Sequence, residues 1–223
     1  HFMTKFTKIV ATISDKRCDV PFIKDLFDAG MNVVRMNSAH LGEAGFDLII
    51  KNVRAVSPEI AILMDTKGPE IRTTANKDGQ TIVLKTGNTI RFVGDPDRET
   101  TTECISCSYP NLVNDIEVGT DLLIDDGEID LKVIEKYTDH LVCEAKNDGL
   151  LGSRKSVNIP GVRINLPSLT EKDKKNIQYA IDYGVDFIAH SFVRSKQDVL
   201  AIQEILDENV SPIKIIAKIE NQE

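Results

Sequence analysis

The sequence predicts an α/β barrel-type fold that is interrupted by a separate all-β domain. Short apolar runs alternate with amphipathic runs in residues 4–72 and again in 160–223, which is typical of parallel strands linked by helices. Between these parts, residues 73–159 alternate β-branched with polar residues and carry recurring turn signals such as Asp-Gly and Thr-Gly. The interruption follows the third expected strand at its C-terminal end, where an α/β barrel carries its functional loops.

The first part is expected to form three strands and two helices. The expected strands are residues 7–13, 32–37 and 60–65. In the first helix Asp19 can act as the N-cap, Pro21 stands in the first turn and Gly30 follows the end. A second helix is expected through residues 46–53. Because the strands are almost continuously apolar, they suit a sheet that is covered on both faces.

The helical period returns after the all-β domain. Thr170 can cap a helix whose apolar side holds Ile177, Ala180 and Ile181. The elements expected to follow are a strand at residues 186–192, a helix at 195–209 and a strand at 214–219. The chain is therefore expected to hold about five barrel strands.

Composition limits the classes of function. With 223 residues, 41% of them hydrophobic, the chain can bury a substantial core. A net charge of -8 argues against general binding to nucleic acid or to an anionic membrane. No apolar run approaches the roughly 20 residues of a membrane span, and no secretory signal is recognisable, so a cytoplasmic location is expected. Residues 1–3 are expected to derive from an expression vector, and the four cysteines to be reduced and structural.

Polar and charged residues follow every apolar strand except the first. They are Arg35 and Asn37, then Asp65, Thr66 and Lys67, then Ser191 and Arg194, and finally Lys218 and Glu220. Each taken singly is most simply a solvated loop charge. In a barrel, however, the C-terminal ends of the strands meet at one mouth, so these side chains could surround a single ligand. A ring of ion pairs around the mouth is the alternative.

Lys218 and Glu220 stand two residues apart on an otherwise apolar strand, which predicts that they share one face. Burial of such a pair needs a compensating ligand or partner. A phosphate on Lys218 beside Mg²⁺ on Glu220 would supply it, and an internal salt bridge is the rival. The usual glycine-rich phosphate loops are missing from the sequence, so a bound nucleotide would be held by side chains.

Several segments together resemble the pyruvate kinase family, in family order and over essentially the whole chain. They are Thr7–Ile13, Met64–Thr73 with its D-T-K-G-P-E motif, Ile124–Gly127, Asn165–Pro167, Glu171–Asp173, Asp186–Arg194 and Ala217–Asn221 with its K-I-E-N motif. The resemblance implies a TIM (β/α)8 barrel, truncated here after about five strands, with a barrel-like all-β lid inserted after the third strand. It also implies phosphoryl transfer from phosphoenolpyruvate to ADP, which yields pyruvate and ATP in glycolysis.

The resemblance further implies a set of site residues. Arg35 would contact the substrate phosphate, Lys218 would bind substrate and stabilise the transferring phosphoryl, and Glu220 would bind Mg²⁺ or Mn²⁺. The nucleotide would be bound by Asn37, His40, Arg72 and Lys155, and K⁺ by Asn37, Asp65 and Thr66.

The chain departs from the family pattern in two respects. Ala39 stands where the family has a serine that helps to bind potassium, although Glu70 is typical of potassium-dependent members, so potassium dependence with an altered ligand set is expected. The resemblance also stops at Glu223, before the last barrel strands, so the chain by itself is expected to be inactive, with exposed sheet edges. The whole protein is expected to be a homotetramer.

Two other functions fit parts of the sequence. One is a metal-dependent barrel lyase that handles phosphoenolpyruvate or pyruvate. The other is a non-catalytic binding module built around the all-β domain. The long insertion and the D-T-K-G-P-E motif favour the kinase over the lyase.

Overall fold

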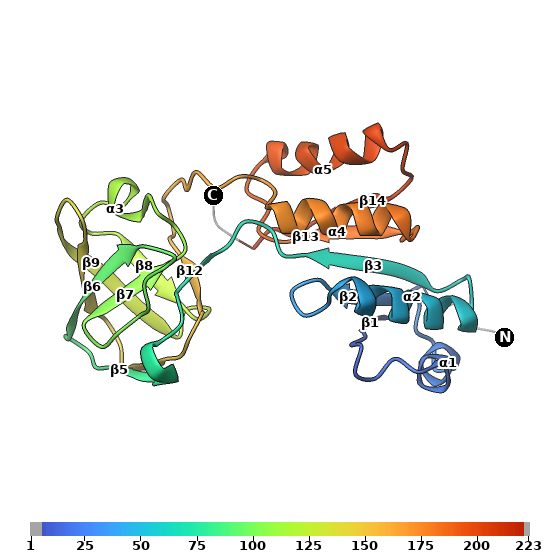
Figure 1. The fold of residues 1–223 in the computed structure, drawn as a ribbon, viewed down its shortest axis with the longest axis horizontal. Coiled ribbons are helices and arrows are strands. Elements are labelled where there is room, and N and C mark those ends of the chain that lie inside the picture. Colours follow the sequence, from blue (N-terminus) through green and yellow to red (C-terminus); the bar gives the residue numbers. More distant parts are fainter. Residues whose placement is uncertain (1–5, 221–223) are drawn as a thin grey trace. The chain divides into compact units, whose positions relative to one another are not determined.

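The computed structural model describes residues 6–220, which form two compact units (Figure 1). The α/β unit contains residues 6–69 and 167–220, and the all-β unit contains residues 70–166. Each unit has its own hydrophobic core. Residues 1–3, expected to come from an expression vector, lie outside the described residues.

The α/β unit is built on a five-stranded sheet in which every neighbouring pair is parallel. Its strands, in spatial order, are β1 (Val10–Thr12), β2 (Val33–Asn37), β3 (Ala61–Thr66), β13 (Phe187–His190) and β14 (Lys214–Ala217). The register pairs Asn37 with Asp65 and Thr66 with His190. The C-terminal ends of neighbouring strands therefore lie side by side, as the sequence predicts.

Four helices accompany this sheet. They are α1 (Val20–Asp28), α2 (Glu43–Val56), α4 (Glu171–Asp182) and α5 (Lys196–Glu208). The predicted start of α1 is confirmed, because the Asp19 carboxylate accepts the Phe22 N–H at 3.0 Å. The capping residue predicted for α4 is also confirmed, since Thr170 and Asp173 form a reciprocal capping box. Throughout residues 6–220, every helix is too short or too polar to cross a membrane.

The last strand corrects one prediction. β14 ends at Ala217, so Lys218 and Glu220 follow the strand and do not stand on its face. Their side chains are 28% and 39% exposed, so the pair is only partly buried. β13 pairs with β14 as far as His190, and Phe192 then lies in the left-handed region with φ of +54°.

The all-β unit contains a seven-stranded sheet, a two-stranded sheet and short helical turns. The larger sheet has, in spatial order, β4 (Ile71–Arg72), β12 (Ser156–Asn158), β8 (Asp121–Ile124), β9 (Ile129–Lys136), β10 (Leu141–Ala145), β6 (Thr89–Gly94) and β7 (Cys104–Cys107). The smaller sheet pairs β5 (Ile82–Leu84) with β11 (Gly149–Leu151). The helical turns are α3 (Leu112–Asp115) and a 3-10 turn at Lys77–Gly79.

The core of the all-β unit follows the predicted alternation. On β9, Ile129, Leu131 and Val133 are buried, and the intervening residues are only partly buried. All four cysteines of the chain are buried and free, as expected for structural thiols. Burial raises the pKa of the Cys107 and Cys143 thiols to about 12, which keeps both groups protonated at neutral pH.

Candidate active site at the carboxyl ends of the strands

The Asp65 carboxylate lies at the centre of the predicted site and is 4% exposed. It accepts hydrogen bonds from Lys218 Nζ at 3.1 and 3.2 Å, and from Arg35 Nε and Nη2 at 2.8 and 2.5 Å. Arg35 and Lys218 are 183 positions apart in the numbering, yet both reach one carboxylate because β2, β3 and β14 end at the same edge of the sheet. The predicted convergence of these cations is thus observed.

Arg35 is held from two neighbouring strands. Besides its contacts with Asp65 on β3, its Nη1 donates to Thr12 Oγ1 on β1 at 3.0 Å. The guanidinium keeps a fixed orientation because both ends of its planar fork are engaged. Its side chain is still 29% exposed, which leaves part of the group available to an anionic ligand.

Ser191 joins the same cluster from the end of β13. Its Oγ donates to Asp65 Oδ1 at 3.1 Å, and its backbone N–H donates to the Thr66 carbonyl at 3.3 Å. The Ser191 carbonyl lies so close to Gly68 that a Cβ on Gly68 would stand 2.2 Å from it. Gly68 also has φ of +69°, so the glycine of the D-T-K-G-P-E motif is required both by backbone conformation and by close approach.

Glu220 lies beside Lys218, with 3.7 Å between Glu220 Oε1 and Lys218 Nζ. The rival internal salt bridge therefore exists, but the ammonium makes its shorter contacts with Asp65. Glu220 Oε2 accepts the backbone N–H of Phe192 at 2.9 Å. A half-exposed carboxylate that accepts one such hydrogen bond retains lone pairs for a hard cation. Glu220 is therefore suited to bind magnesium or manganese.

The residues expected to hold potassium fit less well. The lone pairs of Asp65 are taken by the donors of Arg35, Lys218 and Ser191. The Thr66 hydroxyl is 2.7 Å from His190 Nδ1, and Asn37 Oδ1 accepts the Ala39 N–H at 3.0 Å. Each residue of the expected set is therefore already engaged with other protein groups in this arrangement, and Asp65 most fully.

The residues expected to bind nucleotide are divided between the two units. Asn37 and His40 belong to the α/β unit, where His40 is exposed and its N–H donates to the Asn37 carbonyl. Arg72 and Lys155 belong to the all-β unit. Arg72 pairs with Glu70 at 2.9 Å, and Lys155 pairs with Asp125 at 3.1 Å.

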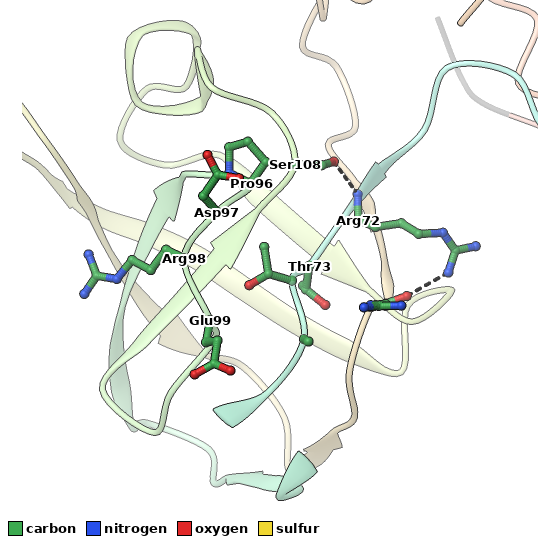
Figure 2. A pocket seen from close by; sticks show the side chains of 10 residues that line it. Arg72, Thr73, Pro96, Asp97, Arg98, Glu99 and Ser108 are labelled. Carbon is green, nitrogen blue, oxygen red and sulfur yellow. Dashed lines mark hydrogen bonds between the residues drawn. The ribbon is translucent and has the colours of Figure 1, made fainter. Parts of the chain in front are cut away.

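Arg72 also lines a cavity of about 300 Å³ in the all-β unit. Figure 2 shows its backbone N–H donating to Ser108 Oγ and its Nη1 donating to the Arg154 carbonyl. The other lining residues labelled there are Thr73, Pro96, Asp97, Arg98 and Glu99. The lining includes both arginines and carboxylates, so their charges largely offset one another.

Sequence reasoning gave no role to Ser191, to the Phe192 amide or to Asp198. Ser191 was recognised only as a polar residue at a strand end, and a backbone N–H leaves no mark in the residue pattern. The one usable signal was that Arg194 and Asp198 stand four residues apart, because this spacing allows an ion pair on or beside a helix.

Comparison with known proteins identifies the family of this chain. The family model described as pyruvate kinase, barrel domain, matches residues 4–223. Curated pyruvate kinases from Borreliella burgdorferi and Staphylococcus aureus strain USA300 are 49% and 45% identical to it, over 99% and 97% of the chain. A crystal structure of a pyruvate kinase from Cryptosporidium parvum superimposes with a TM-score of 0.88 at 37% identity, covering 96% of this chain.

The chain spans less than half the length of these proteins: 46% of the Borreliella enzyme, 38% of the Staphylococcus enzyme and 46% of the Cryptosporidium chain. Its α/β unit with five parallel strands agrees with the barrel-domain description of the family model. The convergence of Arg35, Asp65 and Lys218 occurs within the matched segment. The chain belongs to the pyruvate kinase family.

Proposed function

We propose that residues 4–223 form the N-terminal part of a pyruvate kinase, which transfers a phosphoryl group from phosphoenolpyruvate to ADP to give pyruvate and ATP. The observation that supports this most directly is the meeting of Arg35 and Lys218 on the buried Asp65. The family match makes this cluster a candidate for phosphate binding rather than for structural pairing alone. The part of the protein described here is proposed to be inactive without the rest of the barrel.

The charge of the cluster suits a phosphate ester. Arg35, Lys218 and Asp65 together carry one excess positive charge, which Glu220 balances until it binds a cation, and a phosphate of the substrate can then complement that positive charge. In the proposed role, Arg35 binds the phosphate of phosphoenolpyruvate, and Lys218 stabilises the phosphoryl during transfer. Such a role is plausible physically because phosphoryl transfer depends chiefly on positioning and on electrostatic stabilisation of the equatorial oxygens.

Glu220 is the proposed protein ligand of Mg²⁺ or Mn²⁺. A bound divalent cation would neutralise charge that develops on the phosphate oxygens. Within residues 6–220, no three His, Cys, Asp or Glu side chains gather into a metal-binding group, so Glu220 would share the ion with substrate, water or residues beyond these. Potassium dependence stays a prediction from the resemblance, and no step of the proposed reaction is assigned to that ion.

The remaining roles are proposed on the resemblance. Asn37, His40, Arg72 and Lys155 are proposed to attend the nucleotide. The five parallel strands are proposed to be the first five of an eight-stranded barrel, with the all-β unit inserted after β3 as a lid. Cytoplasmic location and homotetrameric assembly of the whole protein stay predictions of the same kind.

Replacement of Lys218 by alanine in the full-length protein tests the proposed function. ADP-dependent pyruvate formation, followed in a coupled assay, is expected to fall by at least about 10²- to 10³-fold, because one preorganised group that stabilises transition-state charge is lost. Lys214→Ala is the matched control: Lys214 is an exposed lysine at the start of β14, distant in the strand from the cluster, and its loss should leave turnover near the wild-type value.

Two results would overturn the proposal. The first is pyruvate formation by the wild-type protein that continues at the same rate when ADP is omitted, which would indicate a lyase. The second is unchanged turnover in Lys218→Ala, which would remove Lys218 from the mechanism.

A further inference from the structure

Three consecutive residues after β13 contact the proposed site. Ser191 Oγ donates to Asp65 Oδ1, the Phe192 N–H donates to Glu220 Oε2 at 2.9 Å, and the Val193 N–H donates to the Lys218 carbonyl at 3.1 Å. Residues 191–194 are called the β13 loop below. Because this loop supplies the hydrogen bond to Glu220, its conformation decides where the Glu220 carboxylate lies.

The β13 loop contains a backbone conformation that is unfavourable unless neighbouring contacts impose it. Phe192 has φ of +54°, in the left-handed region that a side chain with a Cβ disfavours. A residue stays in this region only when contacts on both sides impose it. On the N-terminal side, the Ser191 N–H is bound to the Thr66 carbonyl. On the C-terminal side, the Val193 N–H is bound to the Lys218 carbonyl, and the next residue, Arg194, is bound to Asp198.

Arg194 is tied to Asp198 by both its backbone and its side chain. Asp198 Oδ2 accepts the Arg194 backbone N–H at 2.8 Å and Nε at 3.2 Å, and Oδ1 accepts Nη2 at 3.0 Å. Ser168 Oγ also donates to Oδ1, at 2.5 Å. Asp198 stands in the first turn of α5 and is 1% exposed, so its carboxylate is a fixed point on a packed helix.

The Asp198 carboxylate is charged at neutral pH. Burial by itself raises its pKa, but the hydrogen bonds from Arg194 and Ser168 more than offset burial and lower the pKa to about 2. The N-terminal end of a helix also favours a negative charge. The ion pair with Arg194 is therefore complete under the conditions in which a metal would bind.

We propose that Asp198, acting through Arg194, holds the β13 loop in the conformation that positions the Glu220 carboxylate for a divalent cation. Asp198 and Arg194 are then positioning residues of the metal site, and neither touches the metal. This inference rests on the proposed role of Glu220. It connects α5 to that role: Asp198 binds Arg194, the backbone continues from Arg194 through Val193 to Phe192, and Phe192 binds Glu220.

Asp198→Asn is the change expected to break this chain of contacts. The amide replaces one acceptor oxygen with a donor, which then faces the donors of Arg194. The β13 loop loses one of its two C-terminal anchors and keeps only the hydrogen bond from Val193 to the Lys218 carbonyl, so Phe192 is held less firmly in the left-handed region. The Glu220 carboxylate must then be ordered again when a metal binds, and loss of such supporting contacts typically lowers metal affinity about 10- to 100-fold.

The test is Mn²⁺ binding to the full-length protein without substrate, measured by electron paramagnetic resonance of the free ion. Asp198→Asn is expected to raise the Kd for Mn²⁺ at least about 10-fold. Hydrogen exchange read by mass spectrometry should show faster exchange of the Phe192 and Val193 amides. Asp207→Asn is the matched control on the same helix, because Asp207 lies in the last turn of α5, where its carboxylate accepts the Gln203 side-chain amide at 2.8 Å.

Arg194→Lys covers the case in which Asp198→Asn does not fold. The lysine keeps the positive charge and the backbone N–H but loses the planar fork, so a smaller weakening of Mn²⁺ binding is expected. The inference is overturned if Asp198→Asn, or Arg194→Lys where the first variant is unfolded, binds Mn²⁺ within twofold of the wild type. It is also overturned if Asp207→Asn weakens binding as much as Asp198→Asn.

Glu220→Gln separates this inference from the proposed function. If Glu220→Gln binds Mn²⁺ as tightly as the wild type, the proposed metal role of Glu220 fails and the inference falls with it. If Glu220→Gln weakens binding and Asp198→Asn does not, the metal role stands and only the positioning by Asp198 is refuted.

Discussion

At the scale of single residues, the site is organised by one buried anion between two cations. Asp65 is 4% exposed, whereas Arg35 and Lys218 are each more than a quarter exposed. A charge is costly to bury unless it is paired, so the Asp65 carboxylate needs both cations. In turn, the carboxylate holds each cation at a defined place. The positions of Arg35 and Lys218 therefore depend on Asp65, for which the sequence indicated only a place at a strand end and a role as a potassium ligand.

Asp65→Asn is expected to damage both stability and activity. The amide cannot neutralise Arg35 and Lys218, and breaking a buried ion pair typically costs about 3 to 5 kcal/mol. Because two like charges then face each other, turnover should also fall by about 10²-fold, in keeping with the loss of positioned charges. Denaturant unfolding and the coupled assay on the full-length protein measure the two effects.

The control for this change is Asp121→Asn. Asp121 pairs with Lys132 on the surface of the all-β unit, where both side chains are at least 40% exposed. Such exposed pairs contribute about 0 to 1 kcal/mol. Equal stability losses for Asp65→Asn and Asp121→Asn would contradict the central role of Asp65.

At the scale of elements, the ends of helices are fixed by local side-chain hydrogen bonds. At the start of α4, the Asp173 N–H donates to Thr170 Oγ1 at 3.0 Å, and the Thr170 N–H donates to Asp173 Oδ2 at 3.1 Å. Asp173 Oδ1 in addition lies 3.4 Å from the N–H of Gly68. The same carboxylate thus begins a helix and contacts the loop that follows β3.

Thr170→Ala is expected to lower the opening free energy of the first turn of α4 by about 1 kcal/mol, because one N–H of that turn loses its acceptor. Thr170→Ser keeps the hydroxyl and should stay within a few tenths of the wild-type value. Native-state hydrogen exchange of the α4 amides measures both variants. If alanine and serine gave the same exchange rates, the capping box would contribute nothing to the stability of this helix.

At the scale of the whole molecule, each unit is built around a separate core. The core of the α/β unit includes Phe46, Ile62 and Ile202, and that of the all-β unit includes Phe92 and Leu131. Each hydrophobic cluster draws its residues from one unit. The α/β unit leaves Val10 on β1 and Ile216 on β14 52% and 40% exposed, at the two outer strands of its sheet.

Residues 70–166 are therefore expected to fold alone. A domain of this size with its own closed core should unfold in one cooperative thermal transition, with slow exchange of the Leu131 amide. Phe92→Ala, which removes a fully buried ring, should lower stability by about 3 to 5 kcal/mol and shift or abolish the transition. A non-cooperative melt of the unaltered residues 70–166 would contradict the independence of this unit.

Much of the fold could be predicted from sequence because the deciding signals are local. The Asp19 and Thr170 caps, the apolar runs that became β2 and β3, and the alternation on β9 each depend on residues within one or two turns. Strand ends were less predictable. β14 stops at Ala217 beside His190, the last residue of β13, although the expected strand ran to Ile219, and the residue pattern contains no sign of that end.

The sequence by itself determined which charged residues stand at strand ends, and hence that Arg35 and Lys218 meet at one edge of the sheet. The tertiary structure alone decided that Asp65 joins these two cations, that Phe192 turns its N–H toward Glu220 and that Asp198 anchors the loop between them. The physical reason is the separation along the chain over which each kind of interaction acts. Periodicity and capping act between neighbours in the chain, whereas ion pairs and hydrogen bonds join residues that come close only when separate strands and helices pack together.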